Sequence, residues 1–255
     1  MNDAPGKQNS VNFLEFIGLE ETNLLASLQN MRQEFDAFSH LDGLYQAAIQ
    51  HAEVPPSRAI VMQLLLFVHY HLFFSTATLL RCHLSEAFAS ARSAVDAAMN
   101  AYRIIEGHGT QEEYVEGAST FQHTPNYIRK ARKKDPTLFP LADHLLKVHG
   151  EFSRSASHAD FAVFAHRLEI KSSEREMIQL GYFQFPKTPP EAKFYFLTLL
   201  HTFTVIASVF ERFLVEEVKA VPREWSQELR TFGITIENWR AKAKAAGERS
   251  RDGQS

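Results

Sequence analysis

The chain contains 255 residues, of which 45% are hydrophobic, which is enough to bury a substantial core in one domain or two small ones. Its formal net charge of −3 gives no global attraction to nucleic acid or to acidic membranes. The single cysteine, Cys82, excludes an intrachain disulfide, and the polar N-terminus lacks the apolar stretch of a signal peptide, so we expect a cytoplasmic protein.

The N-terminal part predicts a disordered segment, residues 1–10, followed by two helical pieces. Apolar residues recur at helical spacing after that segment: Leu24, Leu28, Met31, Phe35 and Phe38. We expect Asp42-Gly43 to interrupt this helix before a second piece that runs through Ala52. Pro55-Pro56 then stops that piece and starts the next helix.

The next helix, residues 59–80, carries no formally charged side chain and must be surrounded by protein or by lipid. It is long enough to cross a bilayer, which takes about 20 residues. A second uncharged run, residues 194–210, is at the lower limit of that length. Both runs contain His, Ser or Thr, and polar groups cost free energy in hydrocarbon. We therefore expect both helices to form the centre of a soluble bundle, with a membrane-associated helical protein as an alternative.

Further helices are predicted after the first uncharged helix, which ends near Cys82. Ser85 is a candidate N-cap for a helix with an apolar stripe that ends at Gly107. Thr110 to Glu113 fits a capping box, and Thr124-Pro125 gives another helix start. A further helix is expected from about Pro136 to Phe152.

The C-terminal third predicts a β-hairpin and then long helices. Residues 161–170 and 177–185 are rich in β-branched and aromatic residues, with a polar link between them. Thr188-Pro-Pro-Glu191 launches a helix over 190–219, and Pro222 opens another that we expect Gly233 to interrupt.

The predicted fold is mostly α, a bundle of about six to eight helices around the pair 57–82 and 190–219, with one small β-hairpin. We expect a single helical-bundle domain over residues 11–241 and a flexible tail over 242–255, which is rich in Ala, Lys, Arg, Gly and Ser.

Several common functional motifs are absent from the sequence. There is no Gly-x-Ser-x-Gly elbow, no glycine-rich phosphate loop and no DNA-binding motif. No two of the 12 histidines are four residues apart, and no Glu-x-x-His pair occurs. We therefore predict no metal site and no cofactor.

The first candidate site is Arg92-Ser-Ala-Val-Asp96, in which the guanidinium and the carboxylate lie on one face of a helix. The basic residue precedes the acidic one, which is the weaker order for supporting the helix, so a tertiary role is an alternative to a plain helix ion pair. A partly buried arginine presents a fork suited to a carboxylate or a phosphate.

The second candidate site is the polar segment 153–160, in which Ser157 and His158 follow a helix and precede the hairpin. His158 could serve as a general base that Asp160 or another carboxylate orients. The alternative is a turn whose Ser and Asp side chains cap backbone amides.

These segments resemble uncharacterised bacterial proteins of HEPN-like, all-helical type over about residues 60–215. The resemblance consists of an Arg with an acidic residue four positions later on a core helix, followed by a Ser-rich turn that ends in His. It implies a helical bundle with a polar cluster of Arg92, Asp96, Ser157 and His158, and no established reaction. The Arg-x₄₋₆-His pattern of HEPN ribonucleases is matched only by Arg103 and His108, where Ile104 stands in place of the usual polar residue.

A third candidate is a basic run that could contact phosphates, preceded by Tyr127. It comprises Arg129, Lys130, Arg132, Lys133 and Lys134. The alternative is a solvated helix face that Glu112, Glu113 and Glu116 neutralise.

Three functions remain open from the sequence. The first is a HEPN-like accessory factor of a bacterial stress or defence system that binds RNA or a nucleotide. The second is a non-catalytic protein–protein interaction module, a homodimer that uses its apolar helices as the interface. The third is the membrane-associated helical protein. Whether the protein is an enzyme is left open.

Overall fold

The computed structural model describes residues 12–50, 52–155, 168–171, 177–180 and 183–252. The N-terminal half contains α1 (Phe13–Asn30), α2 (Arg32–Gln50), the short 3₁₀ helix η1 (Pro56–Arg58), α3 (Ala59–Leu80) and α4 (Leu84–Ile105). Three shorter helices and a longer one follow: α5 (Gln111–Val115), α6 (Ser119–Gln122), α7 (Thr124–Lys134) and α8 (Ala142–Ser155). The C-terminal part contains β1 (Leu168–Lys171), β2 (Met177–Leu180), α10 (Pro189–Val209), the π-helical segment η2 (Phe213–Glu217) and α11 (Arg223–Asp252).

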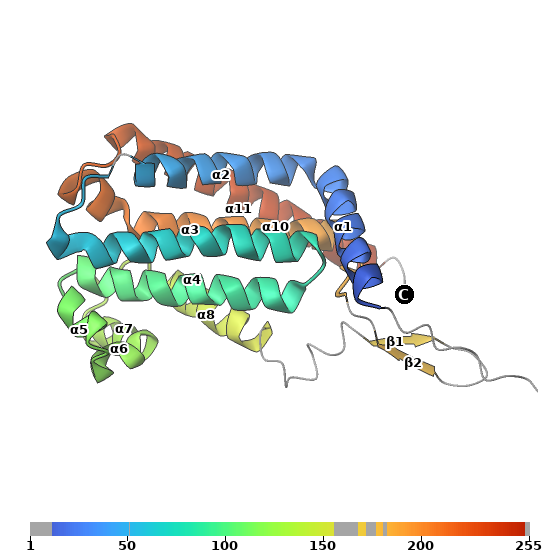
Figure 1. Ribbon diagram of the computed structural model, residues 1–255, viewed down its shortest axis with the longest axis horizontal. Coiled ribbons are helices and arrows are strands. Elements are labelled where there is room, and N and C mark those ends of the chain that lie inside the picture. Colours follow the sequence, from blue (N-terminus) through green and yellow to red (C-terminus); the bar gives the residue numbers. More distant parts are fainter. Residues whose placement is uncertain (1–11, 51, 156–167, 172–176, 181–182, 253–255) are drawn as a thin grey trace, which may run out of the picture.

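The centre of the bundle is α10, which contacts α2, α3, α4, α8 and α11 (Figure 1). It begins where Thr188 accepts a hydrogen bond from the amide of Glu191, with prolines in the first turn. Helices α3 and α4 form a closely packed antiparallel pair in front of α10. Helix α4 also packs closely against α8. The prediction of a mostly α multi-helix bundle is confirmed.

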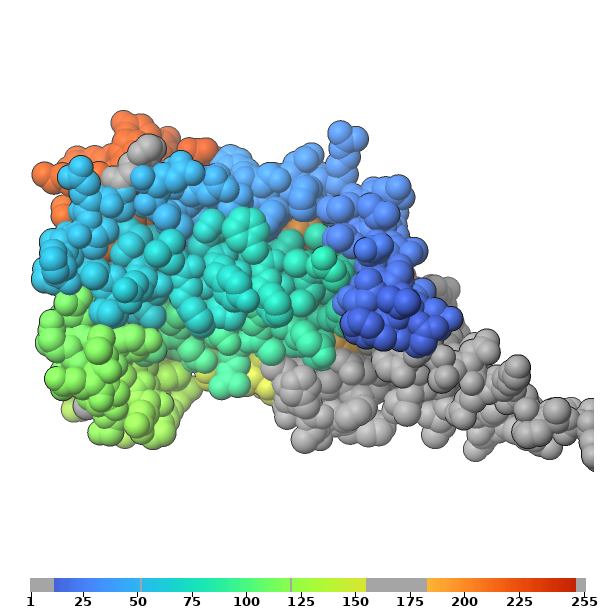
Figure 2. Space-filling model, in the orientation of Figure 1, coloured from blue at the N-terminus to red at the C-terminus, as the bar shows by residue number. Residues whose placement is uncertain are grey.

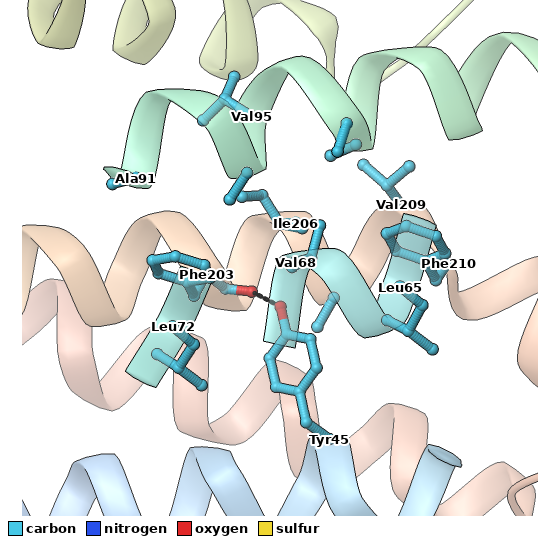
Figure 3. Packing of buried hydrophobic residues seen from close by; sticks show 14 of the residues in the cluster. Tyr45, Leu65, Val68, Leu72, Ala91, Val95, Phe203, Ile206, Val209 and Phe210 are labelled. Atoms are coloured by element: carbon cyan, nitrogen blue, oxygen red, sulfur yellow. Dashed lines mark hydrogen bonds between the residues drawn. The ribbon is translucent and has the colours of Figure 1, made fainter. Parts of the chain in front are cut away.

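The core is a continuous apolar cluster in which side chains from several helices meet (Figure 3). Leu65, Val68 and Leu72 of α3 face Phe203 and Ile206 of α10. The buried Tyr45 hydroxyl of α2 donates a hydrogen bond of 2.7 Å to the carbonyl of Phe203, and burial raises the pKa of this phenol well above its usual value. A buried phenol needs such a partner, so this bond fixes α2 against α10.

The break between the first two helices differs from the expected position. Helix α1 ends at Asn30 and α2 runs unbroken through Asp42 and Gly43, because the inner face of α2 is packed into the core on both sides of this pair. A single glycine costs about 1 kcal/mol in a helix, less than the burial of Leu41 and Leu44 provides. The predicted interruption at Asp42-Gly43 is therefore wrong.

The turn between α3 and α4 closes with a left-handed residue. Cys82 has φ +66°, its amide donates to Leu79, and the amide of His83 donates to Thr78. The start of α4 is then capped from a distant segment, because the Gln184 side chain accepts a hydrogen bond of 2.8 Å from the Ser85 amide and donates one to its hydroxyl. Ser85 therefore lies just inside the helix instead of being its N-cap.

The C-terminal helix is longer than expected. Helix α11 continues across Gly233 and through Asp252, so the predicted interruption is wrong and residues 242–252 are helical where we expected a flexible tail. Ala, Lys, Arg and Glu are strong helix formers, and Trp239 and Ala243 pack against the core beyond the glycine. Trp225, near the start of α11, donates a hydrogen bond of 3.0 Å to the Leu44 carbonyl.

Two short strands occur in the region of the expected hairpin. β1 pairs antiparallel with β2, with Leu168 opposite Leu180 and Lys171 opposite Met177, and Figure 1 places the pair beyond one end of the bundle. The other residues of the expected strands, 161–167 and 181–182, lie outside the described residues. So do residues 1–10, for which we predicted disorder.

Candidate functional site

Arg92 and Asp96 lie on one face of α4, as their spacing requires. The Arg92 Nε and Asp96 Oδ2 atoms are 3.8 Å apart, and the two side chains are 43% and 41% exposed. This separation is too long for a hydrogen bond, so the pair contributes little to the stability of the helix.

Asp96 has a stronger partner on another helix. Its Oδ1 atom lies 3.1 Å from Nε2 of His149 in α8, and the hydroxyl of Ser153 donates to the His149 carbonyl one turn later. The carboxylate therefore joins α4 to α8, which is the tertiary role left open above. His149 was not singled out in the sequence, because a contact between two separate helices leaves no local spacing.

The rest of the predicted cluster cannot be joined to this pair. Ser157 and His158 lie outside the described residues, as does Asp160. A carboxylate beside an imidazole can orient a general base, but no described hydroxyl or thiol is hydrogen-bonded to the His149 ring. The described part of the cluster is a carboxylate–imidazole contact between α4 and α8.

A cleft of about 410 Å³ lies on the other side of Asp96, between α3, α4 and α5. Asp96, Ser93 and Asn100 of α4 line one wall, and Phe67 of α3 lines another. The Asn100 side-chain oxygen is buried and has no hydrogen-bond partner among the described residues. This cleft places a carboxylate directly next to the outer face of α3.

The basic run divides into one structural residue and four exposed ones. Arg132 pairs with Asp143 at 2.6 Å and donates to the carbonyls of Pro136, Leu138 and Phe139, so it braces the turn between α7 and α8. This turn occupies the residues after Pro136 that we expected to be helical, and α8 begins only at Ala142.

The other four basic residues of α7, Arg129, Lys130, Lys133 and Lys134, are exposed. Arg129 donates to Asn126, and no ion pair between these four and an acidic side chain occurs in the described part of the chain. The expected neutralisation by Glu112, Glu113 and Glu116 is not found there, since Glu113 instead completes the capping box of α5 with Thr110.

Arg103 and His108 form a structural element, not a catalytic pair. The Arg103 guanidinium is buried between the rings of Phe121 and Tyr127, at 4.2 and 4.0 Å from their centroids, and burial lowers its pKa. It also donates to the backbone carbonyl of His108, 3.2 Å away. A guanidinium held in this way fixes the α4–α7 corner and cannot reach a phosphate in solvent.

A pair of histidines lies between α8, α10 and α11. The rings of His144 and His201 are 4.8 Å apart, and His201 Nε2 lies 3.1 Å from Glu237. Burial, reinforced by the neighbouring His201, lowers the pKa of His144 to about 4. The described residues contain no group of three His, Cys, Asp or Glu side chains placed to hold a metal ion.

Among the described helices, α3 carries the most large apolar side chains that are exposed, and they lie on its outer face. Five large side chains along this helix are between 43% and 57% exposed: Leu66, Phe67, Tyr70, Phe73 and Phe74. Figure 2 shows α3 in cyan to teal on the front of the molecule, between α2 and α4. By length and composition, Pro56–Leu80 and Pro189–Val209 could each cross a membrane, but core helices of soluble proteins pass the same test.

Comparisons with protein-family models, with curated proteins and with solved structures give no match for this chain.

Proposed function

We propose that this protein is a non-catalytic interaction module that binds a second copy of itself through the outer face of α3. The observation that carries this proposal is the row of five exposed apolar side chains described above. They recur at helical spacing on one side of a helix that has no formal charge. Soluble proteins rarely leave such a continuous apolar surface in water unless it binds something.

The size of this surface fits a dimer. A large aromatic or aliphatic side chain presents about 200 Å², and roughly half of each of the five is exposed, so together they offer roughly 500 Å² per copy. Two copies would bury about 1,000 Å² from these side chains alone, which is where specific interfaces begin. The enrichment in Phe and Tyr also matches the composition of interface centres.

The borders of the face favour a protein partner over lipid. Phe67 and Asp96 line the same cleft, so a bilayer in contact with the aromatic row would also have to cover a carboxylate. On the other border, His69 pairs with Asp42 at 2.7 Å. Charged groups around an apolar centre are the usual anatomy of a protein interface, and opposite charges such as Arg92 and Asp96 can pair across a two-fold axis.

Sedimentation velocity of the full chain tests this proposal. We expect a dimer at micromolar concentration and a monomer for Tyr70→Arg, with an unchanged circular dichroism spectrum. Ile234→Arg is the matched control, because Ile234 is a lone exposed apolar residue on α11 and its replacement should leave the dimer intact. A monomeric wild-type protein, or one that pellets with lipid vesicles, would exclude the dimer.

The second candidate function is the HEPN-like accessory factor that binds RNA or a nucleotide, in a bacterial stress or defence system. The observation in its favour is the four exposed basic side chains of α7, which have no acidic partner among the described residues. Their charges lie within two turns of one helix and can contact successive phosphates.

Fluorescence anisotropy with a labelled single-stranded RNA tests this second candidate. Lys130→Glu with Lys133→Glu should weaken binding at least tenfold and reduce its salt dependence. Lys244→Glu with Arg249→Glu changes the same charge on an exposed part of α11 and should leave the affinity nearly unchanged. Equal losses in both double variants would mean that only net charge matters, and the α7 site would be rejected.

A further inference from the structure

A groove of about 690 Å³ runs between α2 and α11, on a different part of the bundle from the outer face of α3. The two helices are antiparallel here, since His40 of α2 meets Phe232 of α11 while Gln33, two turns earlier, lies beside Trp239. Ala37, Phe232 and Ile236 are buried beneath the groove and give it an apolar floor.

The rim of this groove carries charges of one sign. Asp36 of α2 and Glu224 and Glu228 of α11 are exposed along it, and its lining contains no lysine or arginine. The titratable base in this lining is His40, whose Nε2 lies 2.9 Å from Glu228. A groove with an apolar floor and an acidic rim attracts a ligand that is apolar on one side and basic at its edges.

A second hollow of about 430 Å³ continues the groove past Gln33 and Trp239 toward the start of α10. Lys193 and Lys242 line this hollow together with Glu34, a carboxylate that is only 4% exposed. One Glu34 oxygen lies 3.1 Å from Lys193, and the other is buried and has no hydrogen-bond partner among the described residues. Lys193 therefore compensates the buried carboxylate within the bundle, and the unopposed acidic charges are those on the rim of the larger groove.

We propose that this groove binds a basic amphipathic helix of a partner protein. Its apolar side would lie on Phe232 and Trp239, and its Lys or Arg side chains would meet the acidic rim formed by Asp36, Glu224 and Glu228. From Glu228 to Trp239, α11 rises about 16 Å, which matches about three turns of a bound helix.

The test uses the full chain and a synthetic 14-residue Leu/Lys amphipathic peptide as the probe, followed by tryptophan fluorescence. Trp239 lines the groove whereas Trp225 is buried and hydrogen-bonded to Leu44, so a change in emission reports on the groove. We expect saturable binding below about 100 µM peptide. Trp239→Phe should abolish most of the fluorescence change while calorimetry still detects the peptide.

Charge variants then locate the binding surface. Glu224→Lys with Glu228→Lys should weaken the peptide at least tenfold, whereas Glu21→Lys with Glu116→Lys, which reverses two exposed carboxylates elsewhere, should change its affinity less than threefold. Spermidine, a polycation without an apolar face, should bind at least tenfold more weakly than the peptide. Equal effects of the two double variants, equal binding of spermidine, or no saturable binding would overturn the proposal. None of these outcomes depends on self-association through α3.

Discussion

Helix α3 and the part of α10 after Lys193 form two long uncharged helical stretches, and they meet different surroundings. Helix α10 is contacted by five other helices, and none of its described residues is among the large exposed hydrophobic side chains. Helix α3 also has several neighbours, α1, α2, α4 and α10, but five of its large apolar side chains stay between 43% and 57% exposed. The two helices are alike in apolar composition. The comparison therefore shows that such a helix can either be buried in the core, as α10 is, or leave one side exposed for binding a partner, as α3 does.

The largest expected difference between the two helices is in the cost of losing a phenyl ring. Phe203→Ala on α10 removes a fully buried side chain and should lower the free energy of unfolding by about 3–5 kcal/mol. Phe74→Ala on α3 removes a half-exposed ring and should change it by less than about 0.5 kcal/mol in the monomer. Urea unfolding at nanomolar protein concentration measures both. A loss for Phe74→Ala as large as that for Phe203→Ala would mean that the α3 ring is covered within one copy.

Acid should weaken the packing around α10. The pKa of His144 is about 4 in the folded protein and near 6.5 when unfolded, so the unfolded chain binds the proton more readily. Stability is therefore full above pH 6.5 and falls as the pH drops toward 4, by on the order of 2 kcal/mol after allowance for partial solvation. The lowered pKa of His201 acts in the same direction.

Unfolding curves between pH 7 and pH 4 check this prediction. His144→Gln should flatten the pH dependence in that range, whereas Phe203→Leu, which lowers stability with all histidines kept, should not. If His144→Gln keeps the wild-type slope, the imidazole is not the source of acid sensitivity.

Removing a tyrosine hydroxyl should give a smaller difference in the free energy of unfolding between the core and the outer face of α3. Tyr45→Phe removes the hydrogen bond to the carbonyl of Phe203 and should cost about 1 kcal/mol. Tyr70→Phe removes an exposed hydroxyl on the outer face of α3 and should leave the free energy of unfolding within about 0.5 kcal/mol of wild type. Denaturant melts of the two variants at the same concentration give the comparison. Similar values for both would mean that the Tyr45 bond does not tie α2 to α10.

The smallest effect is expected at the border of the α3 face. Asp96→Asn removes the charge that faces His149 and Arg92, but the carboxylate is well exposed, so the loss should stay below about 1 kcal/mol. It should shrink further at 1 M salt because the charges are screened. A larger, salt-independent loss would show that the Asp96–His149 pair is more strongly coupled than its exposure suggests.

The sequence predicted the helices with strong local signals well. The capping box that begins at Thr110 marks the start of a helix, and so does the N-cap Thr188, which precedes two prolines. It failed where tertiary packing outweighs a local preference, at Gly43 and Gly233, which lie inside continuous helices. It also missed contacts between helices, because nothing in the spacing of α4 indicates that Asp96 meets His149 or that aromatic rings enclose Arg103.

The sequence by itself determined a mostly helical protein with two long uncharged runs, because helical periodicity, capping and proline positions are local properties of the chain. Only the tertiary structure decided which sides of those helices are covered. Coverage depends on which distant segments pack against a helix: none of the described residues of α10 is a large exposed apolar side chain, whereas five such side chains of α3 stay about half exposed.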